Sequence, residues 1–191
     1  MRKQQRQSGA SLVDLMSAAS VAYLMLGLFI WVVGYADFAR SANREGQFLA
    51  KAAAGLQNYL DARGRQIVVN GTTAGFADPY NPTLAELRAA GFMPPNSLAA
   101  TPNGGTLVFT VRRGLGNDLL GLVCDNQNIR HRGQPSETKA AYVVAAAGGT
   151  GLRTRPANTG TLFGTAFQGG ITSPVAGAAI VCAWAAVPNP V

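Results

Sequence analysis

The sequence predicts an α+β protein in which a long N-terminal helix packs on a small antiparallel β-sheet domain with one or two short helices. The helix is indicated by an uncharged run from Leu15 to Ala36 that continues into an amphipathic segment. The sheet is indicated by short, alternating apolar runs between turn residues after position 100. We therefore expect a basic leader, the apolar and amphipathic halves of one helix, and a globular domain, at residues 1–9, 10–36, 37–63 and 64–191.

The uncharged run is long enough to span a membrane. Its 22 residues would form a helix of about 33 Å, which matches the hydrocarbon core of a bilayer. Arg2, Lys3 and Arg6 precede the run, and basic flanks stay in the cytoplasm, so the later residues should be exported. A cleavable secretory signal would have a shorter apolar region followed by a small-residue cleavage site. We expect a membrane-spanning helix with an exported domain.

Asp14 lies at the start of this apolar helix and needs a partner. A charged carboxylate at the centre of a membrane helix costs about 2.5–3.5 kcal/mol, and less near an end. A simple anchor has no reason to keep it. If the chain is cut between Gly9 and Ala10, Asp14 becomes the fifth residue of the mature chain. The new α-amino group of a neighbouring helix could then neutralise the Asp14 carboxylate.

A basic leader, then Gly9, then a hydrophobic helix with an acid at the fifth mature position resembles the class III signal of type IV prepilins and pseudopilins. The resemblance implies the type IV pilin fold and cleavage by prepilin peptidase, with N-methylation of Ala10. It also implies a bacterial inner-membrane protein with a periplasmic head, whose helix packs with other pilin subunits in an extracellular pilus. Most members have Phe or Met first and Glu fifth, whereas this chain has Ala10 and Asp14.

The helix should continue beyond the membrane with one apolar face. Arg63 and Gly64 form a basic last turn and a glycine stop signal, so we expect a helix from about Leu12 to Arg63. Residues 66–70 follow as a short apolar run that ends in a turn. The residues of the apolar stripe, which should face the sheet, are Leu49, Ala52, Ala53, Leu56 and Leu60.

Two short helices are expected in the head. Residues 83–86 form a capping box that opens a helix over Leu84–Ala90. Ser136 can cap a second helix over Glu137–Ala146, although residues 142–144 also have strand propensity.

The strands of the head are indicated by alternation and by turn signals. Residues 107–111 and 119–124 form a predicted hairpin. The glycine-rich tail from Gly149 should contain irregular strands and loops, and Ala178–Ala186 should form the last strand.

Cys124 and Cys182 are the two cysteines of the chain, and both lie in the part expected to be exported. An even number of cysteines in an oxidising compartment predicts a disulfide, here between two strands. Closing a loop of about 59 residues would stabilise the fold by roughly 4 kcal/mol in the chain-entropy model. Two cysteines and the single His131 cannot form a four-ligand zinc site.

The segment around the first short helix carries a narrower resemblance. Residues 87–95 (LRAAGFMPP) and the following LAATPNGGTLVFTV resemble the constant N-terminal portion of the PilV-type minor pilins, the shufflon-linked proteins of conjugative thin pili. The resemblance implies a minor or tip-proximal pilin that acts in adhesion or conjugation, with a ligand on a host or recipient cell. Those proteins continue into a shaft and a variable tip, so a shorter relative or a truncated form would fit the present chain.

No enzymatic constellation stands out, and we expect no catalytic residues, metal or cofactor. His131 lies between two arginines in a polar loop, and residues 148–151 lack the Lys of a phosphate-binding loop. The acids Asp118, Asp125 and Glu137 are scattered. The net charge of +7 falls to +4 without the three basic leader residues, so no nucleic-acid partner is expected.

Two classes of function remain after these exclusions. The first is a filament subunit, which includes major pilins, minor pilins and type II secretion pseudopilins. The second is a single-pass membrane-anchored periplasmic domain with a binding or enzymatic role. Only the first class requires cleavage after Gly9.

Overall fold

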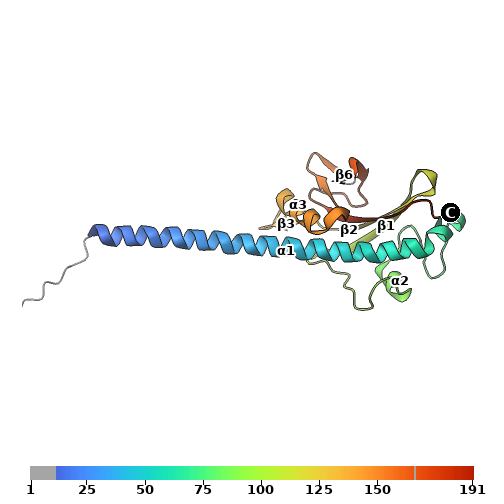
Figure 1. Ribbon diagram of the computed structural model, residues 1–191, viewed down its shortest axis with the longest axis horizontal. Coiled ribbons are helices and arrows are strands. Elements are labelled where there is room, and N and C mark those ends of the chain that lie inside the picture. The colour runs from blue at the N-terminus through green and yellow to red at the C-terminus, as the bar shows by residue number, and fades with distance from the viewer. Residues whose placement is uncertain (1–11, 166) are drawn as a thin grey trace, which may run out of the picture. The chain divides into compact units, whose positions relative to one another are not determined.

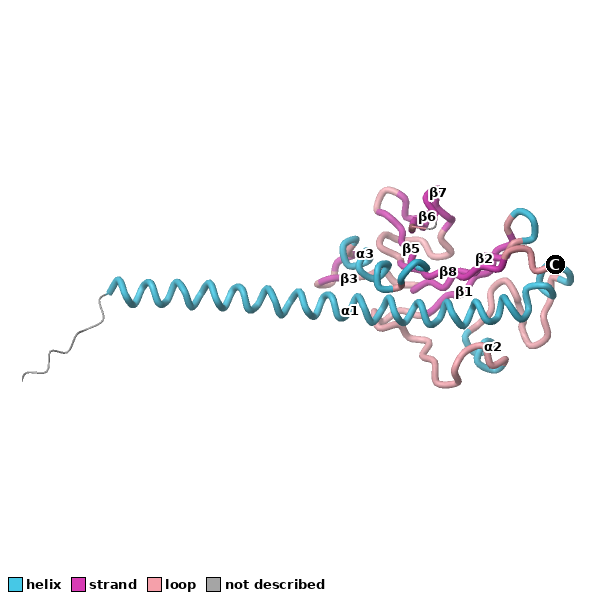
Figure 2. The backbone as a smooth tube through the Cα atoms, in the orientation of Figure 1, coloured by secondary structure: helices cyan, strands magenta, loops and turns pink. Residues whose placement is uncertain are grey.

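The structure is a computed structural model that describes residues 12–165 and 167–191. Its first element is helix α1 (Leu12–Asn70). It is followed by a six-stranded antiparallel sheet and short helices, which confirms the α+β prediction (Figures 1 and 2). The chain divides into two compact units, and the boundary lies within α1, between Asp37 and Phe38. The two units are described separately below.

In the first unit, the described part of α1 is an apolar helix. Every side chain from Leu15 to Tyr35 is exposed, and the rings of Trp31 and Tyr35 stack with their centroids 6.0 Å apart. The helix is long and apolar enough to cross a membrane. An apolar surface of this size requires a cover, which a bilayer or other helices could provide.

The second unit is built on the antiparallel sheet, whose strand order is β1-β2-β8-β5-β6-β7. The last strand of the chain therefore lies between strands that come much earlier. A separate two-stranded hairpin, β3–β4, precedes helix α3. The strands are β1 (Leu107–Arg113), β2 (Leu119–Asp125), β3 (Arg130–His131), β4 (Gln134–Pro135), β5 (Gly151–Arg155), β6 (Asn158–Gly164), β7 (Phe167–Thr172) and β8 (Val181–Val187). The helices of this unit are α2 (Leu84–Ala89) and α3 (Glu137–Ala146), with 3₁₀ turns η1 (Leu115–Asn117) and η2 (Gly148–Thr150).

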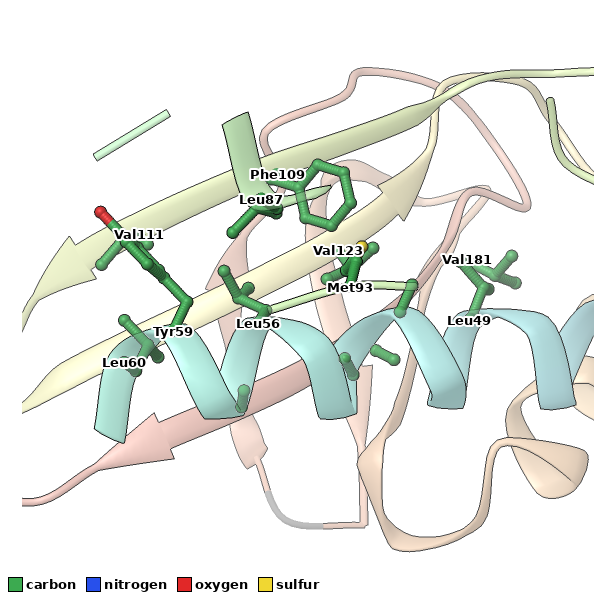
Figure 3. Close-up of a cluster of buried hydrophobic side chains, with 14 of the residues drawn as sticks. Leu49, Leu56, Tyr59, Leu60, Leu87, Met93, Phe109, Val111, Val123 and Val181 are labelled. Carbon is green, nitrogen blue, oxygen red and sulfur yellow. The ribbon is translucent and has the colours of Figure 1, made fainter. Parts of the chain in front are cut away.

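The second half of α1 packs on one face of the sheet. The predicted stripe is buried, and Tyr59 joins it with a side chain that is 0% exposed. Figure 3 shows α1 side chains beside Val123 of β2 and Val181 of β8. Each fully buried Leu or Val contributes roughly 1.5–3 kcal/mol, so this stripe anchors the helix to the head. The core of this face includes Leu49, Leu56, Leu60, Ile67, Leu87, Phe109, Val111, Val123 and Val181.

The helix continues to Asn70, so the prediction that it ends at Arg63 was wrong. Gly64 is a packing residue instead of a stop signal, because a Cβ there would lie 3.2 Å from a methyl group of Leu119. Ile67 keeps the apolar stripe going and is fully buried, which favours continued helix over a separate apolar run. The helix ends at Asn70, and the next residue, Gly71, has a φ of +66° and donates its N–H to the Ile67 carbonyl at 3.1 Å.

The short elements follow their local signals. Thr83 and Glu86 form the predicted capping box of α2, which ends one residue earlier than expected. Ser136 caps α3, which has the predicted bounds, so the helical alternative is confirmed. The last strand begins at Val181 instead of Ala178, because Ala179 has a φ of +55° that a strand does not accept.

Gly46 marks a close approach of α1 and α3. A Cβ there would lie 2.6 Å from the Cβ of Ala146 and would also meet the backbone of that helix end. We expect Gly46→Ala to lower the free energy of unfolding of the head by about 1–3 kcal/mol, despite the higher helix propensity of Ala. Chemical denaturation of the detergent-solubilised protein measures this change. Gly34→Ala is the matched control, since no described atom lies within 4 Å of that Cβ, and equal stabilities of the two variants would contradict the prediction.

Candidate functional site

The predicted processing site, Gly9 and Ala10, lies outside the described residues. Asp14 lies in the first turn of α1, where its backbone is helical. The cleavage and the assembly role of Asp14 stay predictions.

Cys124 and Cys182 form a disulfide, with an S–S distance of 2.08 Å. The two residues are directly opposite each other in the antiparallel pair β2–β8. Both belong to a second apolar cluster, separate from the one that contains the α1 stripe. The disulfide supports an extracytoplasmic head, because such bonds persist in oxidising compartments. The other buried members of this cluster are Leu122, Leu152, Leu162 and Ile180.

A buried pair of carboxyl groups lies where α1 meets the loop before β1. Glu45 of α1 is 2% exposed, and one carboxylate oxygen accepts the backbone N–H of Asn103 at 2.8 Å. Asp125 at the end of β2 is 0% exposed and accepts the Asn103 side-chain amide at 3.1 Å and the Thr101 hydroxyl at 3.0 Å. Asn103 therefore connects both acids and fixes the loop between helix and sheet.

The environment of this pair disfavours its charged form. Burial, and then the nearby Asp125, raise the pKa of Glu45 from its ordinary value of 4.5 to about 7. Burial also raises the pKa of Asp125, against hydrogen bonds from Gln127, Asn103 and Thr101 that lower it. The second oxygen of Glu45 is buried and has no hydrogen-bond partner among the described residues, which makes its ionisation more unfavourable.

We expect Glu45→Gln to stabilise the head at pH 8 and to have little effect at pH 5. Because the folded-state pKa of Glu45 is raised, the folded protein binds this proton more tightly than the unfolded chain does. Stability therefore falls as the pH rises from about 4.5 to about 7 and then levels off. Neutral Gln removes this loss, which is worth about 3 kcal/mol. Urea denaturation at both pH values measures the difference, and a stability gain that is equal at pH 5 and pH 8 would contradict the assignment.

The remaining polar residues singled out from the sequence serve local structure. Glu137 pairs with Arg153 at 2.8 Å, and Asp118 accepts the backbone N–H of Asn189 at 2.9 Å. The His131 ring packs edge-on against Phe38, with centroids 5.0 Å apart. In the described part of the chain, no three His, Cys, Asp or Glu side chains form a group that could hold a metal.

An apolar groove of about 390 Å³ lies beside α1. Phe48 and Gly55 of α1 form one wall, and Met93, Leu98 and Leu107 form the other. The Leu98 side chain on this wall is exposed. The groove is a candidate binding surface with few polar groups, which suits an apolar contact better than a reaction.

Glu45 and Asn103 were missed by sequence reasoning, and Asp125 was noted only as one of several scattered acids. The two carboxyl groups are 80 positions apart, so no local motif connects them. One signal was available in the sequence. Glu45 is at helical spacing from Ala42 and Leu49, so it lies on the buried face of α1, where an unpaired acid is rare.

Comparison of this chain with protein-family models, with curated protein sequences and with solved structures finds no match. The resemblance to type IV pilins therefore depends on the N-terminal sequence pattern and on the pilin-like arrangement of a long apolar helix packed on an antiparallel sheet.

Proposed function

We propose that this protein is a structural subunit of a type IV pilus-like filament, with a minor pilin as the specific assignment. The observation that carries the proposal is one continuous helix, Leu12–Asn70, with two different environments. Its second half is buried against a disulfide-bonded sheet, whereas its apolar first half is exposed. A helix of this kind can first span the membrane and then pack laterally with identical helices in a filament core.

The partners follow from this arrangement. Other subunits would contact the apolar half of the helix, residues 10–36, after prepilin peptidase has cut after Gly9. The inner membrane would hold the same segment before assembly, with the head in the periplasm. We propose no enzymatic activity and no cofactor, and the pilus would act in adhesion or conjugation through a ligand on a host or recipient cell.

The N-terminus of the exported protein tests this proposal. We expect the mature chain to begin at Ala10 with an N-methyl group, as measured by mass spectrometry of the N-terminal peptide. Gly9→Val should abolish the cut, and Ser8→Ala, a change in the adjacent leader residue, should leave it intact. An intact Met1 or a cut beyond residue 30 would overturn the filament assignment.

A membrane-anchored periplasmic binding domain is the second candidate, and the apolar groove beside α1 favours it. Such a protein would keep its leader and would work as a single subunit. The Gly9→Val variant separates the two candidates, because only a filament subunit loses its function when the leader stays attached. A type II secretion pseudopilin shares the same processing, and the abundance of the protein in purified pili distinguishes it from a pilin.

A further inference from the structure

Four basic residues lie on neighbouring elements of the head: the hairpin β3–β4, the helix α3 that follows it, and the part of α1 that shares a hollow with α3. Arg130 lies in β3, Arg132 lies in the turn between β3 and β4, Lys139 lies in α3 and Arg44 lies in α1. The Lys139 amine donates to the Arg130 carbonyl oxygen at 3.0 Å. Arg44 and Lys139 line the same hollow of about 90 Å³. We call these four residues the juxtamembrane basic cluster.

The acids near this cluster do not cancel its charge. Glu137 already pairs with Arg153. Glu45 lines the same hollow as Arg44 and Lys139 and offsets part of the Lys139 charge, but it is 2% exposed and adds no negative charge to the surface. Asp37 is the exposed acid that is nearest along α1. Four basic residues against one exposed acid leave a positive surface.

The chain brings this surface close to the end of the apolar run. Phe38 is two residues after Ala36 in the same helix, a rise of about 3 Å. Its ring contacts the rings of His131 and Tyr142, with centroids 5.0 and 5.3 Å away. His131 lies between Arg130 and Arg132. When residues 15–36 fill the hydrocarbon core, Phe38 follows directly after the core along the chain, so the hairpin that contacts Phe38 is within reach of the lipid headgroups.

Arg132 lies in the turn of the β3–β4 hairpin, at a position with a positive φ that arginine rarely adopts. Arg132 and Gly133 have φ values of 52° and 82°, the positive pair found in type I′ turns. Asn, Asp and Gly suit these positions, whereas Arg is uncommon at positive φ. Both Arg132 and Arg130 are exposed. A guanidinium held at the tip of the hairpin is well placed to reach a phosphate, which it can bind with two parallel hydrogen bonds.

We propose that the juxtamembrane basic cluster binds the phosphate groups of anionic phospholipids on the leaflet beside the head. The inference depends only on the membrane-spanning part of the proposed function, so it applies to a filament subunit and to an anchored domain alike. Each basic residue close to an anionic surface strengthens binding by roughly fivefold. The contact would hold the head against the bilayer while the apolar half of α1 spans it.

Arginine footprinting of the full-length protein tests this proposal. The protein is placed in vesicles of phosphatidylcholine, alone or with about one third phosphatidylglycerol, and is treated with phenylglyoxal before peptide mass spectrometry. Arg130 and Arg132 should react at least about threefold more slowly in the anionic vesicles, and this protection should disappear in about 1 M salt. Arg65, about 40 Å further along α1 than Phe38, should react equally in both. Equal rates for Arg130 and Arg132 in both vesicles, or equal slowing of Arg65, would overturn the proposal.

A double variant tests whether the cluster acts as one site. Arg130→Gln with Arg132→Asn removes two charges and places a residue that suits positive φ in the turn, so the hairpin should still form. Arg44, as a member of the cluster, should also be protected in anionic vesicles with the wild-type protein. It should lose most of this protection in the double variant and keep it in the control, Lys51→Gln with Arg65→Gln. Full protection of Arg44 in the first variant would overturn the proposal. If the arginines of the cluster are protected from phenylglyoxal in sheared filaments but not in anionic vesicles, the proposal is also overturned. The cluster would then bind a neighbouring subunit instead of a lipid.

Discussion

Asp14→Ala protein should be cleaved, folded and disulfide-bonded, yet absent from sheared filaments. In the membrane, the Asp14 carboxylate near the end of the apolar run can still reach water or a headgroup. In a bundle of packed helices it would meet the Ala10 amine of a neighbour. Removing one partner of a buried ion pair costs about 3–5 kcal/mol, because the other charge is left without compensation. Immunoblots of sheared filaments and of membranes measure the distribution of the protein.

Two further variants separate the charge of Asp14 from its size. Asp14→Glu keeps the charge and should restore assembly, whereas Asp14→Asn keeps the shape and should not. The head begins at Phe38 as its own unit, so its disulfide should form in all three variants. Asp14→Ala protein in filaments at the wild-type level would show that the carboxylate has no assembly role, and would favour a simple anchored domain.

Loss of the disulfide should cause the largest change in the stability of the head. Cys124 and Cys182 are 58 positions apart, and a cross-link over this separation removes about 4 kcal/mol of chain entropy from the unfolded state. Both side chains are also buried in an apolar cluster. We therefore expect the double variant Cys124→Ala, Cys182→Ala to lose about 4 kcal/mol in guanidinium denaturation of the detergent-solubilised protein, and more if a cavity remains.

Reduction of the wild-type protein provides the control for the disulfide. Reduced thiols keep the volume of the side chains and remove only the cross-link, so the reduced protein should lie between the native and the double-variant stabilities. An unchanged denaturation midpoint for the double variant would mean that packing alone holds β2 and β8 together.

Several features of this protein follow from signals within one continuous stretch of sequence. The capping box at Thr83 and Glu86 and the cap at Ser136 set the starts of α2 and α3, because neighbouring side chains satisfy the free backbone N–H groups. The length of the run from Leu15 to Ala36 is sufficient to predict a helix that can span a bilayer. The alternation in β1, the apolar run of β2 and the short connection between them predict their hairpin.

Other features depended on contacts that only the folded chain makes. Helix α1 continues past Gly64 because Ile67 extends the buried stripe, and Gly64 itself leaves room for the close approach of Leu119 and Pro190. The position of β8 between β2 and β5 joins segments that are distant in sequence. Local propensity carries no information about such pairings, because their free energy comes from surfaces that meet after folding.

The sequence by itself determined the apolar helix, the caps, the hairpin and the expectation of one disulfide, since each depends on near neighbours or on a count of residues. Tertiary structure alone decided the pairing of Glu45 with Asp125 through Asn103 and the meeting of the basic hairpin with Phe38. The physical reason is that burial and long-range electrostatics depend on which surfaces the fold brings together, and residues 80 positions apart share no local signal.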